Sequence, residues 1–372
     1  MGAKIRLSVL LIVSYLLAAV GGPAQAQTPT PSQTAPLIGR SDVNLNPSGD
    51  LWAWYGPGTA WKQLTDWHYN DRPFISPDGK WVAYRGVPQY MINHTYTGPQ
   101  VAWVPFDMWL LNLDTGKVEI IAGQPPDEDG PVVRSWPTWS PDSRYLAWTE
   151  LGGNFEVTPT GPDDESNYGH LIVYDMQTRK ATTVSRVGAS SGDVPDLAWG
   201  EPGIAVQVLY VGQAEGVSVQ IFSPDGKMLI DILVPATDNL HWVKDGQNVY
   251  LMTNGYLFDP KTGDRSDAPP TLEIYSPTTP SGITLTRTID PQTGSTWQLA
   301  DPGKGVVSLP NCAEVAIAPD GKEAAYATLD GDVYVYLNGK LTQIESQFPI
   351  HGIAWGLTAW RVPLGHTNSP KS

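Results

Sequence analysis

Three stretches in the first half of the sequence combine acidic and aromatic residues, which are residue types that bind ligands. The stretches are 86–105, 123–135 and 151–169. The candidate ligand-binding residues within them are Tyr90, His94, Tyr96, Asp127, Asp129, Asp163, Asp164 and Tyr168. Carboxylates beside aromatic rings would suit a cationic peptide segment, a sugar that stacks on a ring, or a calcium ion. The pattern indicates a binding site without naming its ligand.

Carboxylates of this kind could instead catalyse a reaction. Glycosidic cleavage needs two carboxyl groups, several ångströms apart, with different pKa values. The cluster nearest to that requirement is Glu150, Asp163, Asp164 and Glu165. No pair of nucleophile and base stands out, and the histidines at 94, 170 and 241 are too scattered to predict a metal site. We therefore expect a protein without catalytic residues, metal or cofactor, and keep a glycan hydrolase or lyase as the alternative.

A repeated tetrapeptide indicates which elements position these stretches. Ser76-Pro77-Asp78-Gly79 returns as Ser140-Pro141-Asp142-Ser143 and as Ala318-Pro319-Asp320-Gly321, each time before an aromatic or apolar run such as 81–84. Such self-similarity is typical of repeat architectures, in which each unit buries its apolar face against its neighbours. The 15 Trp, 16 Tyr, 37 Gly and 34 Pro residues favour short strands separated by tight turns. The sequence therefore predicts one repeated all-β unit.

Each repeat predicts four antiparallel strands, which make one blade of a β-propeller. In the second copy the strands are expected at 137–140, 145–148, 170–174 and 181–184. Seven inner strands are expected to begin near Arg72, Trp136, Leu197, Leu240, Ile274, Glu314 and Gly352. We expect seven blades, although the weak fourth and fifth copies leave a count of six or eight open. All three candidate stretches fall in second-to-third-strand or blade-to-blade connections, which share one face of a propeller.

Two sets of turns are expected to be structural. Turns between third and fourth strands are predicted at Asp114–Gly116, Asp175–Thr178, Asp259–Gly263 and Asp290–Gly294. Asp can cap such a turn and Gly accepts a positive φ, whereas a calcium loop would need alternating oxygen ligands and a distal Glu. Ser223-Pro224-Asp225-Gly226 has the letters of the repeat but lies between apolar runs at 217–221 and 228–230. It is therefore expected to be the third-to-fourth-strand turn of blade three.

The two ends of the chain are expected to close the ring together. The runs 351–355 and 358–362 predict the two inner strands of the last blade. The runs 50–55 and 61–65 predict its third and fourth strands. Closure by strands from both ends would remove the exposed sheet edges that favour aggregation.

The inner strands of Trp-Ser-Pro-Asp-Gly type, the aromatic second strands and the fourth strand ending in Gln63-Leu64-Thr65 resemble the TolB-like (WD-like) β-propeller repeat. The strongest motifs lie at 74–84, 137–148 and 315–326. This repeat is also related to the N-terminal propellers of prolyl oligopeptidase-type peptidases. The resemblance covers the propeller only. The small α/β domain of periplasmic TolB is not expected before Leu37, and the α/β-hydrolase domain that follows a peptidase propeller is not expected because the sequence ends at Ser372.

The N-terminus has the layout of a secretory signal peptide. Lys4 and Arg6 precede an apolar run at 7–20, and small residues follow at Ala24-Gln25-Ala26. We expect cleavage after residue 26; an uncleaved anchor helix, which would want about 20 apolar residues, is the alternative. Residues 27–36 are rich in Thr and Pro and predict a disordered leader. The expected organisation is a signal peptide at 1–26, the leader, one propeller domain at 37–363 and a disordered tail at 364–372.

Charge and cysteine content restrict the partners and the compartment. The chain has 23 basic and 38 acidic residues, and loss of Lys4 and Arg6 leaves 21 against 38, a net charge of −17. Nucleic acid and anionic membranes are therefore poor partners. The single Cys312 cannot form an internal disulfide. We expect a monomeric, non-enzymatic protein, exported to the periplasm or the extracellular space, with no membrane span after cleavage and with a protein, peptide or cell-envelope glycan as its partner.

Overall fold

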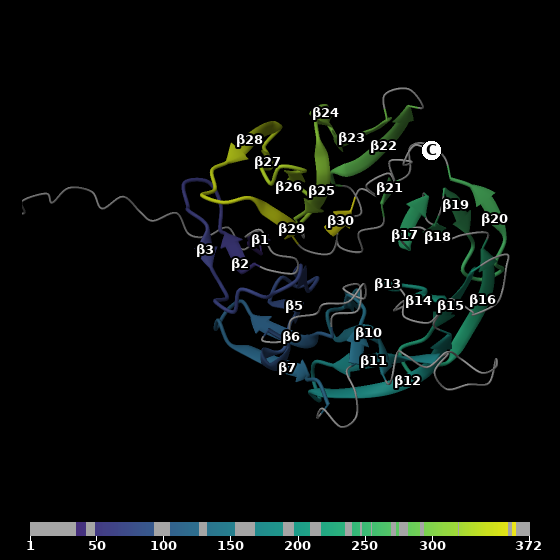
Figure 1. Cartoon of the computed structure of the whole chain (residues 1–372). Coiled ribbons are helices and arrows are strands. Elements are labelled where there is room, and N and C mark those ends of the chain that lie inside the picture. Colours follow the sequence, from purple (N-terminus) through teal and green to yellow (C-terminus); the bar gives the residue numbers. More distant parts are fainter. Residues whose placement is uncertain are drawn as a thin grey trace, which may run out of the picture. The chain divides into compact units, whose positions relative to one another are not determined.

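The protein is a seven-bladed β-propeller, as the sequence predicts. The computed structural model describes residues 35–41, 49–92, 105–125, 132–152, 168–188, 197–208, 217–234, 240–245, 248–253, 255–268, 273–274, 282–290, 294–318, 320–355 and 359–361. These residues form seven antiparallel sheets, each of which is one blade of the ring (Figure 1). The blades belong to one compact unit, Gln33–Ser372.

Blades one to three follow one another along the chain. Blade one contains β4 (Phe74–Ile75), β5 (Trp81–Gly86), β6 (Asp107–Asn112) and β7 (Val118–Ala122). Blade two contains β8 (Val132–Arg134), β9 (Thr138–Trp139), β10 (Tyr145–Gly152), β11 (Tyr168–Asp175) and β12 (Lys180–Gly188). Blade three contains β13 (Leu197–Gly200), β14 (Gly203–Val208), β15 (Val217–Phe222) and β16 (Met228–Val234). Blade two has a divided inner strand, because β8 and β9 both pair with β10.

Blades four to six continue the same plan. Blade four contains β17 (His241–Asp245), β18 (Asn248–Thr253), β19 (Tyr256–Phe258) and β20 (Arg265–Asp267), joined by β21 (Glu273–Ile274). Blade five contains β22 (Thr284–Asp290), β23 (Gly294–Asp301) and β24 (Gly305–Leu309). Blade six contains β25 (Cys312–Ile317), β26 (Ala324–Thr328), β27 (Val333–Leu337) and β28 (Lys340–Ile344), joined by β30 (Ala359–Arg361).

The seventh blade is shared by the two ends of the chain, but not in the predicted proportion. Its order is β29 (Ile350–Ala354), β1 (Leu37–Ser41), β2 (Leu51–Trp54) and β3 (Lys62–Gln63). The predicted second strand at 358–362 is wrong, because β30 pairs with β25 of blade six instead. The segment β1 takes the second position and buries Leu37 and Ile38 completely. One C-terminal and three N-terminal strands therefore close the ring.

Blade five also differs from the sequence prediction. The run near Ile274 forms β21, which pairs with β17 of blade four and not with β22. The outermost strand of this blade is β24, which pairs with β23. The turn Asp290–Gly294 joins β22 to β23, one position further inward. Its predicted place, directly before the outermost strand, is therefore wrong. The turn before the outermost strand β24 is Asp301–Gly305.

The remaining turns lie where the sequence predicts. In the turn after β11, Asp175 Oδ1 accepts the backbone N–H of Gln177 (2.8 Å), and in the turn after β19 Asp259 does the same for Lys261 (2.7 Å). The turn after β6 is capped by Asn112 rather than Asp114, since Asn112 Oδ1 accepts Thr115 N–H (2.8 Å). The segment 223–226 joins β15 to β16, which confirms that it is not an inner-strand turn.

The repeat tetrapeptide itself is a structural turn. Ser76 Oγ donates to Asp78 Oδ1 (2.6 Å), and Ser140 Oγ makes the equivalent bond to Asp142 (2.6 Å). Gly79 has the positive φ of 71° that such a turn requires. The N–H of Asp78 also donates to Ser143 Oγ (2.9 Å), so the turns of blades one and two are joined.

Apolar clusters fill the spaces between consecutive blades. One cluster contains Ile38 and Leu51 of blade seven with Tyr84 and Leu111 of blade one. Tryptophans of the inner strands add hydrogen bonds across the same boundaries: Trp139 Nε1 donates to Phe74 O (2.9 Å) and Trp242 Nε1 to Ala198 O (3.1 Å). Each blade is therefore stabilised by its neighbours, as in other repeat proteins.

Candidate functional site

We call the face that carries the second-to-third-strand and blade-to-blade connections the elaborated face. The three candidate stretches all leave the sheets on this face: 86–105 links β5 to β6, 123–135 follows β7 and includes β8, and 151–169 links β10 to β11. Tyr90 lies in the short helix α1 (Gln89–Ile92), and Tyr168 begins β11. The other candidates, His94, Tyr96, Asp127, Asp129, Asp163 and Asp164, lie outside the described residues. Their convergence into one site stays a prediction.

One buried arginine joins the roots of all three stretches. Arg134 is only 3% exposed. Its Nη1 donates to Phe106 O (2.6 Å) at the end of the first stretch, and its Nη2 donates to Gly123 O (2.9 Å) at the start of the second. Its Nε donates to Glu150 Oε1 (2.7 Å), just before the third. A single guanidinium therefore fixes where the three connections begin or end.

Gln124 closes the second stretch in a similar way. Its side-chain amide accepts Val132 N–H (2.8 Å) and donates to Val132 O (3.0 Å), as a neighbouring strand would. Its backbone N–H donates to Asp107 Oδ1 (2.8 Å). Burial raises the pKa of Asp107, and this bond and the charge of Arg134 only partly offset the effect. Gln124 and Val132, the residues on either side of the stretch that contains Asp127 and Asp129, are therefore held together.

A second arginine cluster surrounds a buried carboxylate between blades seven, one and two. Asp71 accepts hydrogen bonds from Arg85 Nε (3.0 Å), Trp136 Nε1 (2.8 Å) and Arg40 Nη1 (3.3 Å). Burial raises the pKa of Asp71, but the charges of Arg85 and Arg40 and the hydrogen bonds from Arg85 and Trp136 outweigh it and hold the pKa well below its usual range. Arg85 Nη1 also donates to Arg134 O (2.6 Å), which links this cluster to the loop roots.

The same network continues across the closure of the ring. Arg72 forms an ion pair with Glu314 of blade six (3.5 Å), and Glu314 Oε2 accepts the N–H of Ile353 in β29 (2.9 Å). The backbone comes close here, since a Cβ on Gly352, whose φ is 60°, would lie 3.0 Å from the Cβ of Arg72. Blades six, seven and one are therefore held together at the elaborated face by charged side chains. We call the set Arg40, Asp71, Arg72, Arg85, Arg134, Glu150 and Glu314 the charged seam.

The structure gives Glu150 a positioning role. Its Oε1 accepts both Arg134 Nε (2.7 Å) and Trp148 Nε1 (2.9 Å). The neighbouring His170 lies opposite Glu150 in the pairing of β10 with β11. The other carboxylates of the proposed catalytic cluster lie outside the described residues. Glu150 therefore gives no support to a role in acid–base catalysis.

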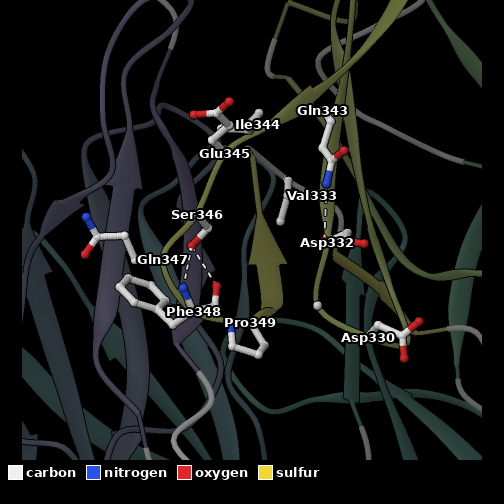
Figure 2. Close-up of a pocket in the computed structure, with 11 residues that line it drawn as sticks. Asp330, Asp332, Val333, Gln343, Ile344, Glu345, Ser346, Gln347, Phe348 and Pro349 are labelled. Atoms are coloured by element: carbon white, nitrogen blue, oxygen red, sulfur yellow. Dashed lines mark hydrogen bonds between the residues drawn. The ribbon is translucent and has the colours of Figure 1, made fainter.

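An open pocket lies elsewhere on the elaborated face, at blades six and seven (Figure 2). It has a volume of about 510 Å³ and is lined by residues 330–333 and 343–349. The first group belongs to the turn between β26 and β27, and the second to the connection from β28 to β29. The sequence did not indicate this pocket.

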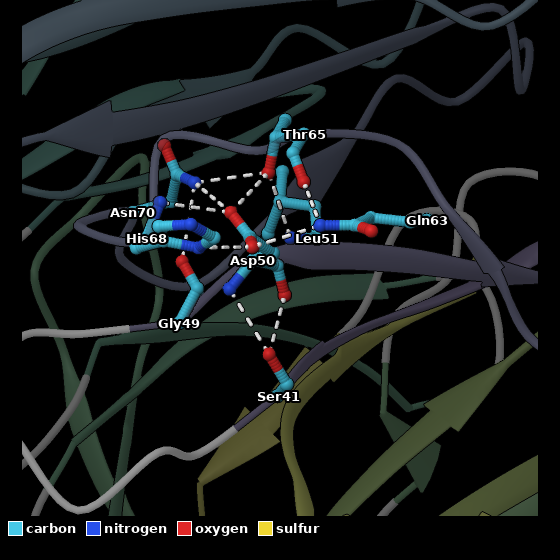
Figure 3. A network of polar contacts seen from close by, with 8 residues as sticks. All are labelled: Ser41, Gly49, Asp50, Leu51, Gln63, Thr65, His68 and Asn70. Carbon is cyan, nitrogen blue, oxygen red and sulfur yellow. Dashed lines mark hydrogen bonds and ion pairs between the residues drawn. The ribbon is translucent and has the colours of Figure 1, made fainter.

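A polar network holds the connection between blades seven and one (Figure 3). Asp50 is buried, and its carboxylate accepts from His68 Nδ1 (2.7 Å), His68 N–H (2.9 Å) and Gln63 Nε2 (3.0 Å). Asn70 Nδ2 donates to Thr65 Oγ1 (2.9 Å) beside it. His68 has a positive φ of 66° and an imidazole that is 67% exposed. The network therefore holds the backbone of His68 at its positive φ, while the imidazole of His68 remains exposed to solvent.

Within the described ranges, no group of three or more His, Cys, Asp or Glu side chains is arranged to hold a metal ion. No helix in the same part of the chain has both the length and the apolar character needed to cross a membrane. The predicted signal peptide lies outside the described residues.

Sequence reasoning named Glu150 as a possible catalytic carboxylate but missed its positioning role, the rest of the charged seam and Gln124. These residues lie at strand ends or in connections, where a polar residue is normally assigned to solvent. In the folded structure, Phe106 and Trp136 flank one of these arginines. The guanidinium of Arg85 lies 4.4 Å from the ring centroid of Phe106 and 5.2 Å from that of Trp136, as in cation–π pairs.

Comparisons with known proteins agree with the fold and do not assign a family. No protein-family model and no curated protein matches the chain. Among solved structures, Pyrococcus horikoshii acylaminoacyl peptidase matches at 12% identity and a TM-score of 0.50, over 84% of this chain and 52% of the peptidase. An oligogalacturonate lyase in complex with manganese matches at 12% identity and a TM-score of 0.50, over 80% of this chain and 83% of the lyase.

TolB is also among the matches. TolB from Acinetobacter baumannii matches at 14% identity and a TM-score of 0.42, over 87% of this chain and 67% of TolB. The chain spans about half the length of the peptidase structure above. The predicted resemblance to TolB-like propellers is confirmed at the level of the fold by the seven antiparallel blades of the structure. The neighbours include peptidases and a lyase as well as TolB, so the shared property of this chain and its structural neighbours is the β-propeller fold.

Proposed function

We propose that this chain is an exported, non-catalytic β-propeller that binds a protein, a peptide or a cell-envelope glycan through the three connections above blades one and two. The observation that supports the proposal is the position of Arg134, which is buried and bonded to the roots of all three connections. Ligand-binding residues commonly lie on loops that a rigid scaffold positions. A charged side chain bonded at three loop roots is such a scaffold.

Charge is consistent with this class of ligand. The chain has 38 acidic and 23 basic residues, and four of the arginines are engaged in the charged seam. A partner with amines, guanidinium groups or hydroxyls would meet acceptors on the predicted loops, whereas a polyanion would be repelled. The proposal includes no cofactor and a monomeric state; calcium held by the loop carboxylates is kept as the alternative.

Capture of a partner from a cell-envelope extract tests the proposal. The mature protein is compared with a triple variant, Tyr96→Ala, Asp129→Ala and Asp164→Ala. Two exposed substitutions on the opposite face, Asp114→Ala and Lys322→Ala, serve as the matched control. We expect the triple variant to lose the captured partner and the control to retain it. Equal capture by all three proteins would refute the assignment of this site, and loss of capture in EDTA that calcium restores would add the ion.

A panel of polysaccharides separates binding from catalysis. We expect bound glycan, if glycan is the ligand, to be recovered at its original length. Turnover that disappears in Asp163→Asn or Glu165→Gln would replace the proposal with a glycan hydrolase or lyase. Size-exclusion chromatography with light scattering tests the monomeric state in the same preparation.

A further inference from the structure

The pocket at blades six and seven is a second candidate site, made by residues that the proposed function does not use. Its volume of about 510 Å³ lies within the range of about 300–1,000 Å³ that is common for small-ligand sites. One wall is the turn between β26 and β27, and the other is the connection from β28 to β29 (Figure 2). The pocket therefore lies where the last C-terminal inner strand enters the ring.

The base of the pocket is rigid. The N–H of Ile350 donates to Gly331 O (3.0 Å), which joins the two walls. Gly331 has a φ of 83°, and a Cβ on it would lie 2.5 Å from the Cβ of Pro349, so the walls touch at this glycine. Val333 and Ile344 are buried beneath them. Because both walls are fixed to the core, the pocket exists before any ligand binds.

The walls offer polar groups that have no partner among the described residues. The side chains of Asp330, Glu345 and Gln347 make no hydrogen bond or ion pair with any residue that the structure describes. Asp332 and Gln343 are bonded to each other, Nε2 to Oδ1 at 3.2 Å. No Lys, Arg or His is among the described residues that line the pocket. The pocket therefore presents both acceptors and amide donors, without a cation to neutralise the carboxylates.

An aromatic ring completes the lining. Phe348 lies in the same wall as Glu345 and Gln347, and its ring packs against Trp52 of β2 with centroids 4.5 Å apart. Backbone bonds fix its position, since Ser346 Oγ donates to Phe348 O (2.7 Å) and accepts from Phe348 N–H (3.3 Å). A fixed ring beside acceptors and donors is suited to a ligand with an apolar face and many hydroxyl groups.

We propose that this pocket binds a neutral oligosaccharide. Its hydroxyls would donate to Asp330, Asp332 and Glu345 in charge-assisted hydrogen bonds, and the free amide of Gln347 would donate to and accept from the sugar. Phe348 would contact the C–H face of a ring. A uronic-acid oligomer would be rejected, because its carboxylates would meet three others. The pocket shares no residue with the candidate site over blades one and two, so the two proposals succeed or fail independently.

Isothermal titration calorimetry of the mature protein tests this proposal. The probes are cellotetraose, maltotetraose and N-acetylchitotetraose as neutral sugars, trigalacturonate as an anionic sugar, and spermidine as an organic cation. We expect at least one neutral sugar to bind and trigalacturonate not to bind. The double variant Asp330→Asn, Glu345→Gln should weaken sugar binding by about tenfold or more, because each lost charge weakens a hydrogen bond to a hydroxyl. Phe348→Leu should also weaken binding.

The control and the refuting results are specific to the pocket. Asp66→Asn and Asp114→Asn remove exposed carboxylates elsewhere and should leave the affinity unchanged. Both pocket substitutions in the double variant are isosteric and exposed, so an unchanged melting temperature will separate a lost site from a lost fold. Failure of every neutral sugar to bind at millimolar concentration overturns the proposal, and binding of spermidine alone reassigns the pocket to organic cations. Binding that the double variant and Phe348→Leu leave intact shows that the sugar sits elsewhere.

Discussion

Replacement of Asp71 tests whether the charged seam stabilises the elaborated face. Asp71 is 6% exposed and neutralises Arg40 and Arg85. In Asp71→Asn, the guanidinium groups of Arg40 and Arg85, whose side chains are 16% and 13% exposed, lose their shared counter-charge. Removal of one partner from a buried ion pair costs about 3–5 kcal/mol. We therefore expect a loss of that size in the free energy of unfolding.

The loss can be converted into a melting temperature. Unfolding entropy is about 2.1 cal/mol/K per residue, which for the roughly 340 residues of the unit Gln33–Ser372 amounts to about 0.7 kcal/mol/K. A loss of about 3–5 kcal/mol then lowers Tm by about 4–7 °C, measured by calorimetry at pH 7. Asp66→Asn is the matched control, because Asp66 is exposed in the same connection. It should change Tm by about 1 °C or less.

The pH dependence gives an independent check on the cause. Burial raises the pKa of Asp71, and the charges of Arg85 and Arg40 more than reverse the shift, so the folded pKa lies below the unfolded one. A lowered folded pKa means that the stabilisation is complete above the unfolded pKa of about 4. It is lost as the pH falls from there toward the folded value. The Tm difference between wild type and Asp71→Asn should be constant from pH 5 to 8 and should shrink below about pH 4. Two results would refute the reasoning. One is a Tm of Asp71→Asn equal to that of Asp66→Asn at pH 7, and the other is a Tm difference from wild type that grows in acid.

Three further predictions concern titratable groups in blades four and six. Burial, with a smaller effect of Glu314, raises the pKa of the Cys312 thiol to about 12, so Ellman's reagent at pH 8 should react at least about 100-fold faster in urea than in the native protein; equal rates would contradict this. Burial lowers the pKa of His241 to about 4, so its stabilisation is complete above the unfolded pKa of about 6.5 and falls by up to about 1.4 kcal/mol per pH unit as the pH decreases toward 4. His241→Gln should flatten this part of the urea-midpoint profile, and an unchanged slope would assign it to other groups. Glu314→Gln should lower the urea midpoint because it weakens the pair with Arg72 at the ring closure, whereas the exposed Glu201→Gln should not; equal midpoints would exclude a role in closure.

The propeller could be predicted because its turns repeat locally. The false copy at 223–226 was separated from the true ones by the apolar runs on either side, and the structure places it between β15 and β16. The wrong strand predictions concern short strands that could pair with the sheet edge of either of two neighbouring blades. Both β21 and β30 pair with the inner strand of an adjacent blade, and the choice between edges depends on which strand already occupies the place. Which edge is already occupied depends on the tertiary structure, and a run of three to five residues does not contain that information.

For the candidate site over blades one and two, the sequence could predict the location but not the bonds that hold it. Long connections are visible in a sequence, and all three leave the elaborated face. The bonds that fix them are not visible, because Arg134 reaches a carbonyl 28 positions earlier and a carboxylate 16 positions later. The pocket at blades six and seven depends in the same way on Gly331 meeting Pro349, a contact between two turns that only the folded ring brings together.

The charged seam also affects which ligands we expect the elaborated face to attract. Its four arginines, at positions 40, 72, 85 and 134, face three carboxylates, at positions 71, 150 and 314, so the seam has a net charge of +1 within a chain of net charge −15. The rest of the chain therefore has a net charge of −16. Arg134 and Arg72 have side chains only 4% and 6% exposed, and their guanidinium groups cannot reach an incoming anion. Because these cations stabilise the scaffold and the free carboxylates line the pocket, we expect the face to favour neutral or cationic ligands over anionic ones.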